Sequence, residues 1–207
     1  MALTTYTAGE VLTAASLNSN FSFAAQSGGL VSVAPTSVGK TGASSTATAS
    51  INGQVTFTLC ETLLLNGVFT SAYSNYRIVF SGFASTGASL LARMSVGGTP
   101  STAASYNRQQ IVASNTALAG VRDTGATSWT VANNINTTDG DNFSMDIFNP
   151  QAAKNTTLNV LSFSPAAGSY WQSIGAYFTA ATVFDGIQFF PSTGNFSGTI
   201  TVYGYNQ

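Results

Sequence analysis

The chain has 207 residues, only 6% of them charged, and a formal net charge of −1 at neutral pH. This length suits one β-sandwich domain with a short appendage. A charged fraction far below the roughly 25% of ordinary globular domains leaves neutral polar residues to cover the surface. Because weakly charged surfaces repel one another little, we expect the protein to self-associate or to sit inside a larger assembly.

Several functions are disfavoured by what the sequence lacks. Its six basic residues are scattered singly, so there is no basic stripe for a nucleic-acid partner. No apolar run approaches the ~18 residues that span a bilayer, and we expect no membrane insertion. The N-terminus is neither basic nor apolar, which predicts a chain that is not exported by a secretory signal.

Catalysis is also disfavoured, because the chain contains no histidine. This excludes a Ser-His-Asp triad, a Cys-His dyad and an ordinary zinc site. Cys60 is the only cysteine, and we expect it to be a small core residue. We predict no enzyme and no catalytic residue; a polysaccharide depolymerase using two carboxylates is the enzymatic alternative. Its acids would come from Glu10, Glu61, Asp123, Asp139, Asp141, Asp146 and Asp185.

One local acidic cluster, residues 139–142, has the sequence Asp-Gly-Asp-Asn. Its oxygens could bind calcium, but the spacing is not that of a twelve-residue calcium loop. A solvated Asp-Gly turn is the favoured interpretation. We therefore predict no metal site and no cofactor.

The first 26 residues have the pattern of a helix. Thr7 and Glu10 form a capping box, and Tyr6 and Val11 are spaced for a hydrophobic staple. A second start at Thr13 would place an apolar stripe along one face, too short to be stable alone. It would pack on the sandwich or, as we favour, on the same helix of neighbouring copies. The predicted assembly residues are Tyr6, Glu10, Val11, Leu12, Leu17 and Phe21.

Residues 27–50 are rich in Gly, Ser, Thr, Ala and Val and contain no aromatic residue. This composition is typical of an extended linker with at most one short strand. The segment could be a flexible tether, or its small residues could let several copies wind together about an axis. The predicted organisation is therefore a helical anchor over 1–26, a linker over 27–50 and a β-sandwich head over 51–207.

From residue 51 onward, short runs rich in Val, Ile, Phe, Tyr and Thr alternate with turn residues, which predicts an all-β, two-sheet sandwich. Alternation is clearest near the end, where Ile200 and Val202 share one face with Gly204. The predicted core aromatics are Phe57, Phe80, Phe148, Phe163, Phe178 and Phe189. We predict strands at Gln54–Leu59, Tyr76–Phe83, Ser89–Val96, Arg108–Ala113, Ser128–Ala132, Phe143–Phe148, Thr157–Phe163, Tyr170–Thr179, Val183–Phe190 and Gly198–Tyr205.

Three segments carry a resemblance to a known group of proteins. Residues 6–21, YTAGEVLTAASLNSNF, resemble the opening segment of tail-fibre and related virion proteins of tailed bacteriophages. Residues 184–205, FDGIQFFPSTGNFSGTITVYGY, resemble the last strands of small phage virion β-domains, and Tyr73–Phe80 resembles a phrase near their second strand. The chain departs from large fibres in having no long coiled coil or β-helix shaft.

The resemblance implies a jelly-roll-like sandwich in a homotrimer, with the N-terminal segment facing the particle and the β-domain pointing outward. The expected location is the virion, assembled in the host cytoplasm, and the expected partners are virion proteins at the tail or baseplate. The function implied is that of a short tail fibre that attaches to the host surface. An adaptor or a capsid decoration protein with a purely architectural role is the alternative.

Attachment to a host surface would require a binding face for glycans. Sugars are commonly held by aromatic faces beside neutral hydrogen-bonding groups. An aromatic residue in a β-sandwich is more often part of the core or of a subunit interface. The candidates for glycan contact are Trp129, Tyr170, Trp171 and Tyr177.

Overall fold

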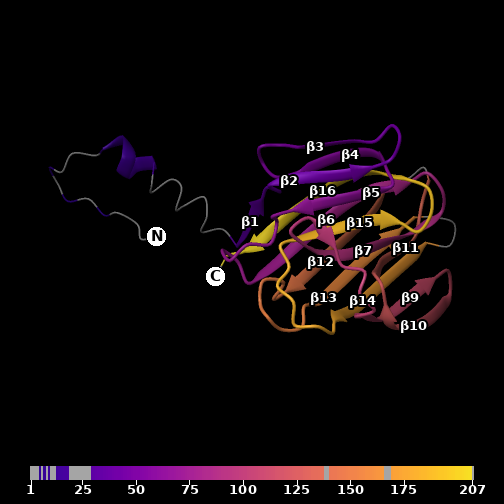
Figure 1. Cartoon of the computed structure of the whole chain (residues 1–207). Helices are drawn as coiled ribbons and strands as arrows, with labels where there is room; N and C mark the ends of the chain where they lie inside the picture. Colours follow the sequence, from indigo (N-terminus) through magenta and orange to yellow (C-terminus); the bar gives the residue numbers. More distant parts are fainter. Residues whose placement is uncertain are drawn as a thin grey trace.

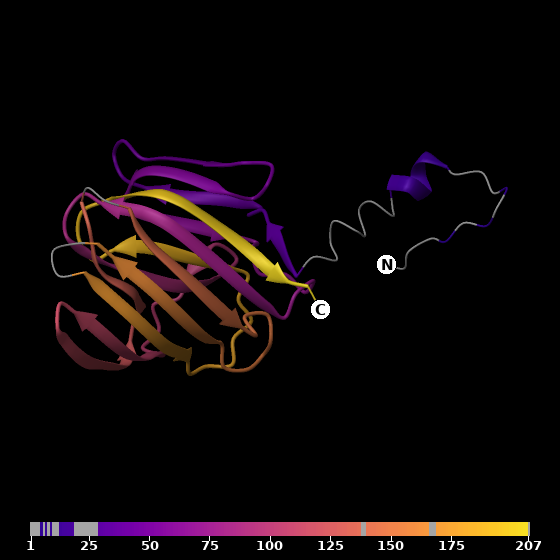
Figure 2. The same ribbon diagram turned by 180° about the vertical axis from the view of Figure 1, so that it is seen from behind.

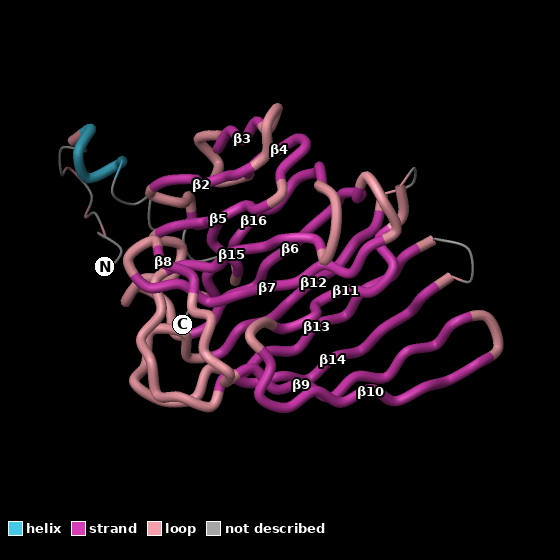
Figure 3. Tube along the Cα trace, turned by 45° about the vertical axis from the view of Figure 1, so that its right-hand side comes forward, coloured by secondary structure: helices cyan, strands magenta, loops and turns pink. Residues whose placement is uncertain are grey.

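The structure is a computed structural model that describes Thr5, Thr7, Gly9 and residues 13–18, 29–137, 140–165 and 169–206. Most of the described chain is strand, as Figure 3 shows in magenta. The strands form two antiparallel sheets that lie face to face, seen from opposite sides in Figures 1 and 2. The predicted all-β, two-sheet sandwich is therefore confirmed.

The larger sheet has ten strands, and β6, β12, β13 and β14 form its centre. Strand β1 (Leu30–Val33) lies off the main path and pairs with β16. The other strands, in their order across the sheet, are β10 (Ala117–Ala126), β9 (Tyr106–Ser114), β14 (Tyr170–Phe178), β13 (Thr157–Ser164), β12 (Asp141–Phe148), β6 (Asn75–Ala84), β16 (Phe196–Tyr205), β4 (Val55–Cys60) and β3 (Thr46–Ala49).

The smaller sheet has six strands and covers one face of the larger sheet. Its short strand β8 (Thr99–Pro100) pairs only with β7. The remaining strands, in spatial order, are β11 (Trp129–Ile135), β7 (Ala88–Val96), β15 (Gly186–Pro191), β5 (Thr62–Asn66) and β2 (Ser37–Thr41).

The core lies between the two sheets and is built largely from aromatic rings. Trp129 on β11 meets Tyr106 on β9 edge-on, with ring centroids 4.8 Å apart, and Tyr106 meets Phe178 at the same separation. Phe80 stacks on Phe143 from the neighbouring strand at 4.9 Å. Such pairs add specific geometry to the free energy gained by burying apolar area.

A row of buried polar side chains crosses one side of this core. Gln110 donates its amide to Gln172 Oε1 at 2.7 Å, and both side chains are fully buried. Gln172 also bonds both backbone groups of Asn133, at 3.0 and 3.1 Å. Arg108 donates to Gln110 and to Asp123. This network joins β9, β10 and β14 of the larger sheet to β11 of the smaller one.

Each of the ten predicted strands overlaps a strand of the structure. Cys60 is fully buried, as expected, and burial raises the pKa of its thiol. Strands β1, β2, β3, β5, β8 and β10 were not predicted.

The linker predicted over residues 27–50 is wrong for most of its length. Strands β1, β2 and β3 lie in this segment and pair with β16, β5 and β4, so the sandwich begins near Leu30 rather than at residue 51. All of their side chains are half-buried or exposed. Backbone pairing, more than side-chain burial, holds these strands, and composition alone does not reveal such pairing.

Two of the predicted core aromatics are placed differently. Phe148 is half-buried and Phe163 is 47% exposed, whereas Phe57, Phe80, Phe178 and Phe189 lie in the core. Phe163 points away from the core because Leu158 and Val160, on the same strand, take the inward positions, and a strand alternates its faces strictly.

The second predicted helix start is confirmed. Residues 14–18 are helical, and Thr13 Oγ1 accepts a hydrogen bond from the Ser16 amide at 3.2 Å, which is the geometry of an N-cap. Leu17 is half-buried. The other predicted assembly residues, Tyr6, Glu10, Val11, Leu12 and Phe21, lie outside the described residues. No described helix is long and apolar enough to cross a membrane.

Candidate functional site

The outer face of the larger sheet, turned away from the smaller sheet, carries several large apolar side chains. Strand β13 is the clearest case, since it exposes Leu161 (51%) and Phe163 (47%) while it buries Ser162 and Ser164. The Ser162 hydroxyl has no hydrogen-bond partner among the described residues. Burial of Leu or Phe stabilises a fold by about 1.5–3 kcal/mol per side chain. Stability alone does not explain this arrangement, and such local conflicts are typical of functional surfaces.

These side chains form an apolar groove of about 430 Å³ along β12. Cross-strand pairing puts Val79, Ser144 and Leu161 in one row across the sheet. The next row contains Asn142, Phe163 and Trp171. The short polar side chains of β12 thus lie between apolar walls from β6 and from β13 and β14. We call this feature the β12 groove.

The β12 groove combines the two kinds of contact that hold a neutral sugar. Trp171 is 43% exposed and lies beside Phe163, so both rings can meet the C–H face of a pyranose. Asn142 and Ser144 can exchange hydrogen bonds with its hydroxyl groups. The lining of the β12 groove contains no charged residue.

A polar cluster adjoins the β12 groove in the next row of the same face. Arg77 binds Asp146 in a bidentate ion pair at 2.8 and 2.7 Å, and Tyr205 donates its hydroxyl to the same carboxylate. Burial by itself raises the pKa of Asp146, but the hydrogen bonds from Arg77 and Tyr205 and the charge of Arg77 hold it below its ordinary value. Burial and the bond to Asp146 raise the pKa of Tyr205.

This ion pair predicts a specific loss of stability in acid. Because the pKa of Asp146 is lower in the folded state, its stabilisation is complete above the unfolded pKa of about 3.9 and disappears as pH falls through the folded pKa. In Asp146→Asn we expect the melting temperature to fall less steeply below about pH 4 than in the wild type. Thermal melts from pH 7 to 2 measure this difference.

The matched control is Glu61→Gln, which removes an exposed carboxylate immediately before β5. Its acid profile should follow that of the wild type. If Asp146→Asn and the wild type lose stability in parallel, the ion pair does not contribute to the pH dependence.

The four predicted glycan contacts do not form one cluster. Trp129 is 1% exposed and packs in the core, so its prediction as a glycan contact is wrong. Tyr170 is half-buried and has the parity of the core-facing residues of β14. Trp171 and Tyr177 are both 43% exposed on the outer face, but five residues separate them along the strand. Only Trp171 lines the β12 groove.

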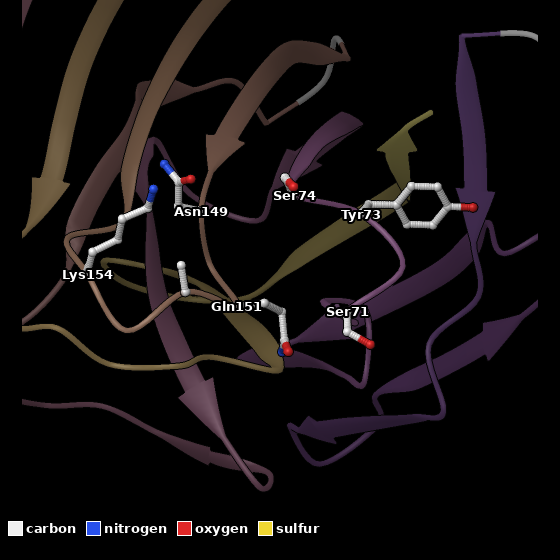
Figure 4. A pocket seen from close by; sticks show the side chains of 7 residues that line it. Ser71, Tyr73, Ser74, Asn149, Gln151 and Lys154 are labelled. Atoms are coloured by element: carbon white, nitrogen blue, oxygen red, sulfur yellow. The ribbon is translucent and has the colours of Figure 1, made fainter. Parts of the chain in front are cut away.

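A second depression, of about 360 Å³, lies at one end of the sandwich between the loops that precede β6 and follow β12. Figure 4 shows Tyr73 on one side of it and Lys154 on the other. Gln151 donates its amide to the carbonyls of Phe69 and Phe184 and so ties three loops together. The Tyr73 ring covers Gly204, where an added Cβ would lie 2.3 Å from it. These side chains have structural roles, so we favour the β12 groove as the functional site.

The described aspartates have structural partners as well. Asp123 binds Arg108, Asp185 accepts the Gly97 amide, and Asp141 accepts the Asn136 amide and is buried. The turn prediction for residues 139–142 is therefore wrong in one respect, since Asp141 begins β12 and is not solvated. Within the described ranges, no three His, Cys, Asp or Glu side chains gather into a group that could hold a metal.

Val79, Leu161 and Phe163 were not predicted from the sequence as site residues. The available pattern was the run from Leu158 to Phe163, in which apolar residues occupy both faces of one strand. Such a run is compatible with a strand covered on both sides, and the run Ile78-Val79-Phe80 of β6 allows the same interpretation. The structure leaves Val79 41% exposed instead.

Comparisons with known proteins do not place the chain in a family. No family model and no curated protein matches it. A protein of unknown function from Shewanella oneidensis MR-1 is similar in structure, with a TM-score of 0.36 and 10% identity over 86% of this chain and 78% of that one. The catalytic domain of an endo-1,3-β-glucanase (laminarinase) from Thermotoga petrophila RKU-1 gives a TM-score of 0.21 and 11% identity over 78% and 75%. At these scores neither similarity bears on function.

Proposed function

We propose that the protein is a bacteriophage virion structural protein, a short tail fibre or fibre-like component that attaches to a host-surface glycan through the β12 groove. The observation that carries the binding role is the groove itself, in which Trp171 and Phe163 stand beside Asn142 and Ser144 on an uncharged surface. The N-terminal segment serves as the anchor to the particle. Resemblance of residues 6–21 and 184–205 to phage virion proteins supports the virion location.

A non-enzymatic role fits the side chains present. The chain has no histidine to act as a general base, and the partners of Asp123, Asp141, Asp146 and Asp185 are ones that stabilise the fold. The protein would act as a homotrimer, as the resemblance to phage virion proteins implies. A surface with so little charge favours association, and several weak glycan contacts gain strength when they are joined.

The binding half of the proposal is tested on susceptible cells. Labelled full-length protein should bind them and compete with infection, and Trp171→Ala should reduce binding at least tenfold. The matched control is Tyr203→Ala, an aromatic residue on the same sheet in the row of the polar cluster, outside the groove. Retention of full binding by Trp171→Ala would remove the groove from the attachment role.

The anchoring half is tested with residues 27–207. This truncated protein retains β1 to β16 and should bind cells like the full chain, because every described strand begins after residue 29. It should be missing from assembled particles. Incorporation at the normal copy number would show that the anchor lies elsewhere.

A second candidate is an architectural role, as an adaptor or a decoration protein. It is favoured by the aliphatic part of the groove, since Val79 and Leu161 expose area that subunit contacts commonly bury. In that case Trp171→Ala would change the oligomeric state, which sedimentation measures. Neither the wild type nor any variant would bind cells.

A further inference from the structure

The outer face holds a second hollow, of about 280 Å³, at the opposite side of the larger sheet from β16. It lies over β14, β9 and β10 and is lined in part by Gly175, Tyr177, Gln109 and Arg122. We call it the Gly175 notch. It is somewhat smaller than pockets for drug-sized ligands, which start at about 300 Å³, and suits one sugar unit.

Gly175 forms the floor of the notch, and the fold does not require glycine there. Its φ is not positive, and a Cβ built on it would meet only Asn159 Oδ1, at 3.8 Å, an ordinary contact distance. At Gly82, Gly186 and Gly204, by contrast, an added Cβ would lie within 2.5 Å of other atoms. Glycine inside a strand is destabilising relative to alanine and often marks a place where a ligand approaches the backbone.

The walls of the notch supply complementary chemistry. Tyr177 is 43% exposed and lies two residues from Gly175, on the same face of β14. Gly175 pairs with Gln109 on β9, which pairs with Arg122 on β10, so an amide and a guanidinium follow the floor across the sheet. A register shift between Asp123 and Ala126 interrupts the pairing of β10 with β9 beside the notch.

The charge of the notch is positive. Arg108 and Asp123 also line it but neutralise one another in an ion pair. Arg122 is exposed and makes no ion pair with a described residue. A guanidinium binds carboxylates in a planar, bidentate manner, which a neutral sugar does not exploit.

We infer that the Gly175 notch binds a carboxylated sugar unit, such as a uronic or sialic acid, of the same glycan whose neutral units occupy the β12 groove. Arg122 binds the carboxylate, Tyr177 packs against the sugar ring and Gln109 bonds a hydroxyl. This inference rests on the proposed attachment function and assigns its ligand to acidic glycans. Trp171 and Gly175 are four residues apart on one face of β14, so the two sites are about 13 Å apart along the strand, a distance that a short oligosaccharide spans.

The test is calorimetric titration of the full-length protein with trigalacturonate, a hyaluronan tetrasaccharide and sialyllactose, each paired with its carboxyl-reduced counterpart. At least one acidic probe should bind tenfold or more tightly than its reduced form. Arg122→Gln should abolish that preference, whereas Lys154→Gln, which removes an exposed cation elsewhere, should retain it. Absence of any preference for the acidic probes would overturn the inference.

Gly175→Ala separates the binding role from a structural one. We expect at least a fivefold loss of affinity for the acidic probe together with an unchanged or higher melting temperature. Gly120→Ala is the matched control. It adds a methyl group to β10 on the face that carries Arg122, in similarly open space, but Gly120 does not line the notch. Full affinity in Gly175→Ala, or equal binding of triglutamate as a simple carboxylate peptide, would overturn the assignment.

The two proposals fail in different ways. If cell binding depends on Trp171 but the protein shows no preference for acidic probes, the attachment function stands and the notch has no role in it. If an acidic probe binds in an Arg122-dependent manner but cell binding does not depend on Trp171, the notch is a ligand site and the groove does not mediate attachment.

Discussion

Replacement of Trp129 by alanine should lower the free energy of unfolding by about 3–5 kcal/mol, a large part of the 5–15 kcal/mol that holds a typical domain together. Trp129 is 1% exposed, meets the Tyr106 ring at 4.8 Å and donates its indole N–H to the Tyr177 carbonyl. Its removal leaves a cavity where the two sheets meet. Denaturant unfolding followed by circular dichroism measures the loss.

Trp171→Ala is the natural comparison, since it removes the only other tryptophan. Trp171 lies on the outer face, so this change should cost about 1 kcal/mol or less, mainly through the loss of its cross-strand pairing with Phe163. Comparable losses in the two variants would contradict the division between a core tryptophan and a surface tryptophan.

Gln172→Leu should destabilise the sandwich by about 3 kcal/mol or more. The substitution leaves the Gln110 amide and both backbone groups of Asn133 without the partners seen in the structure. Each buried polar group left unsatisfied costs about 1–3 kcal/mol. Chemical denaturation of the variant gives the value.

Ser173→Ala is the control for this second prediction, because Ser173 is adjacent in sequence but exposed on the outer face. Its effect should stay within about 0.5 kcal/mol. A double variant with Gln110→Leu should lose less than the sum of the two single changes, since the two glutamines are partners. Strict additivity would contradict the coupling.

The sequence predicts the central strands well because their apolar residues recur with the period of a strand. Phe57, Phe80, Phe178 and Phe189 each occupy the core side of such a run. The strands that were not predicted have other patterns: Thr and Ala dominate β3, and β10 has no fully buried residue. Their strand conformation comes from pairing with neighbours far along the chain, which residue type does not encode.

The kind of residue in the candidate site, an aromatic side chain, was predictable from the sequence, but which aromatic residues lie on the surface was not. Trp171 was identified because it is aromatic, and Trp129 was identified for the same reason although it is buried. Phe163 was assigned to the core because it is aromatic, but Leu158 and Val160 take the inward positions of β13 and so turn Phe163 outward. The notch around Gly175 could not be predicted from the sequence, because only the three-dimensional structure distinguishes a glycine that the fold requires from one that it does not.

Strand β1 has a consequence for how the sandwich can be used. Leu30 pairs with Tyr205, and the Asn206 amide donates to the Gly29 carbonyl at 2.8 Å, so the chain comes into the sandwich beside the point where it leaves. A domain with adjacent ends can be inserted into a loop of an unrelated protein without separating the ends of that loop. The sandwich is thus suited to insertion as a complete domain into a surface loop of another protein.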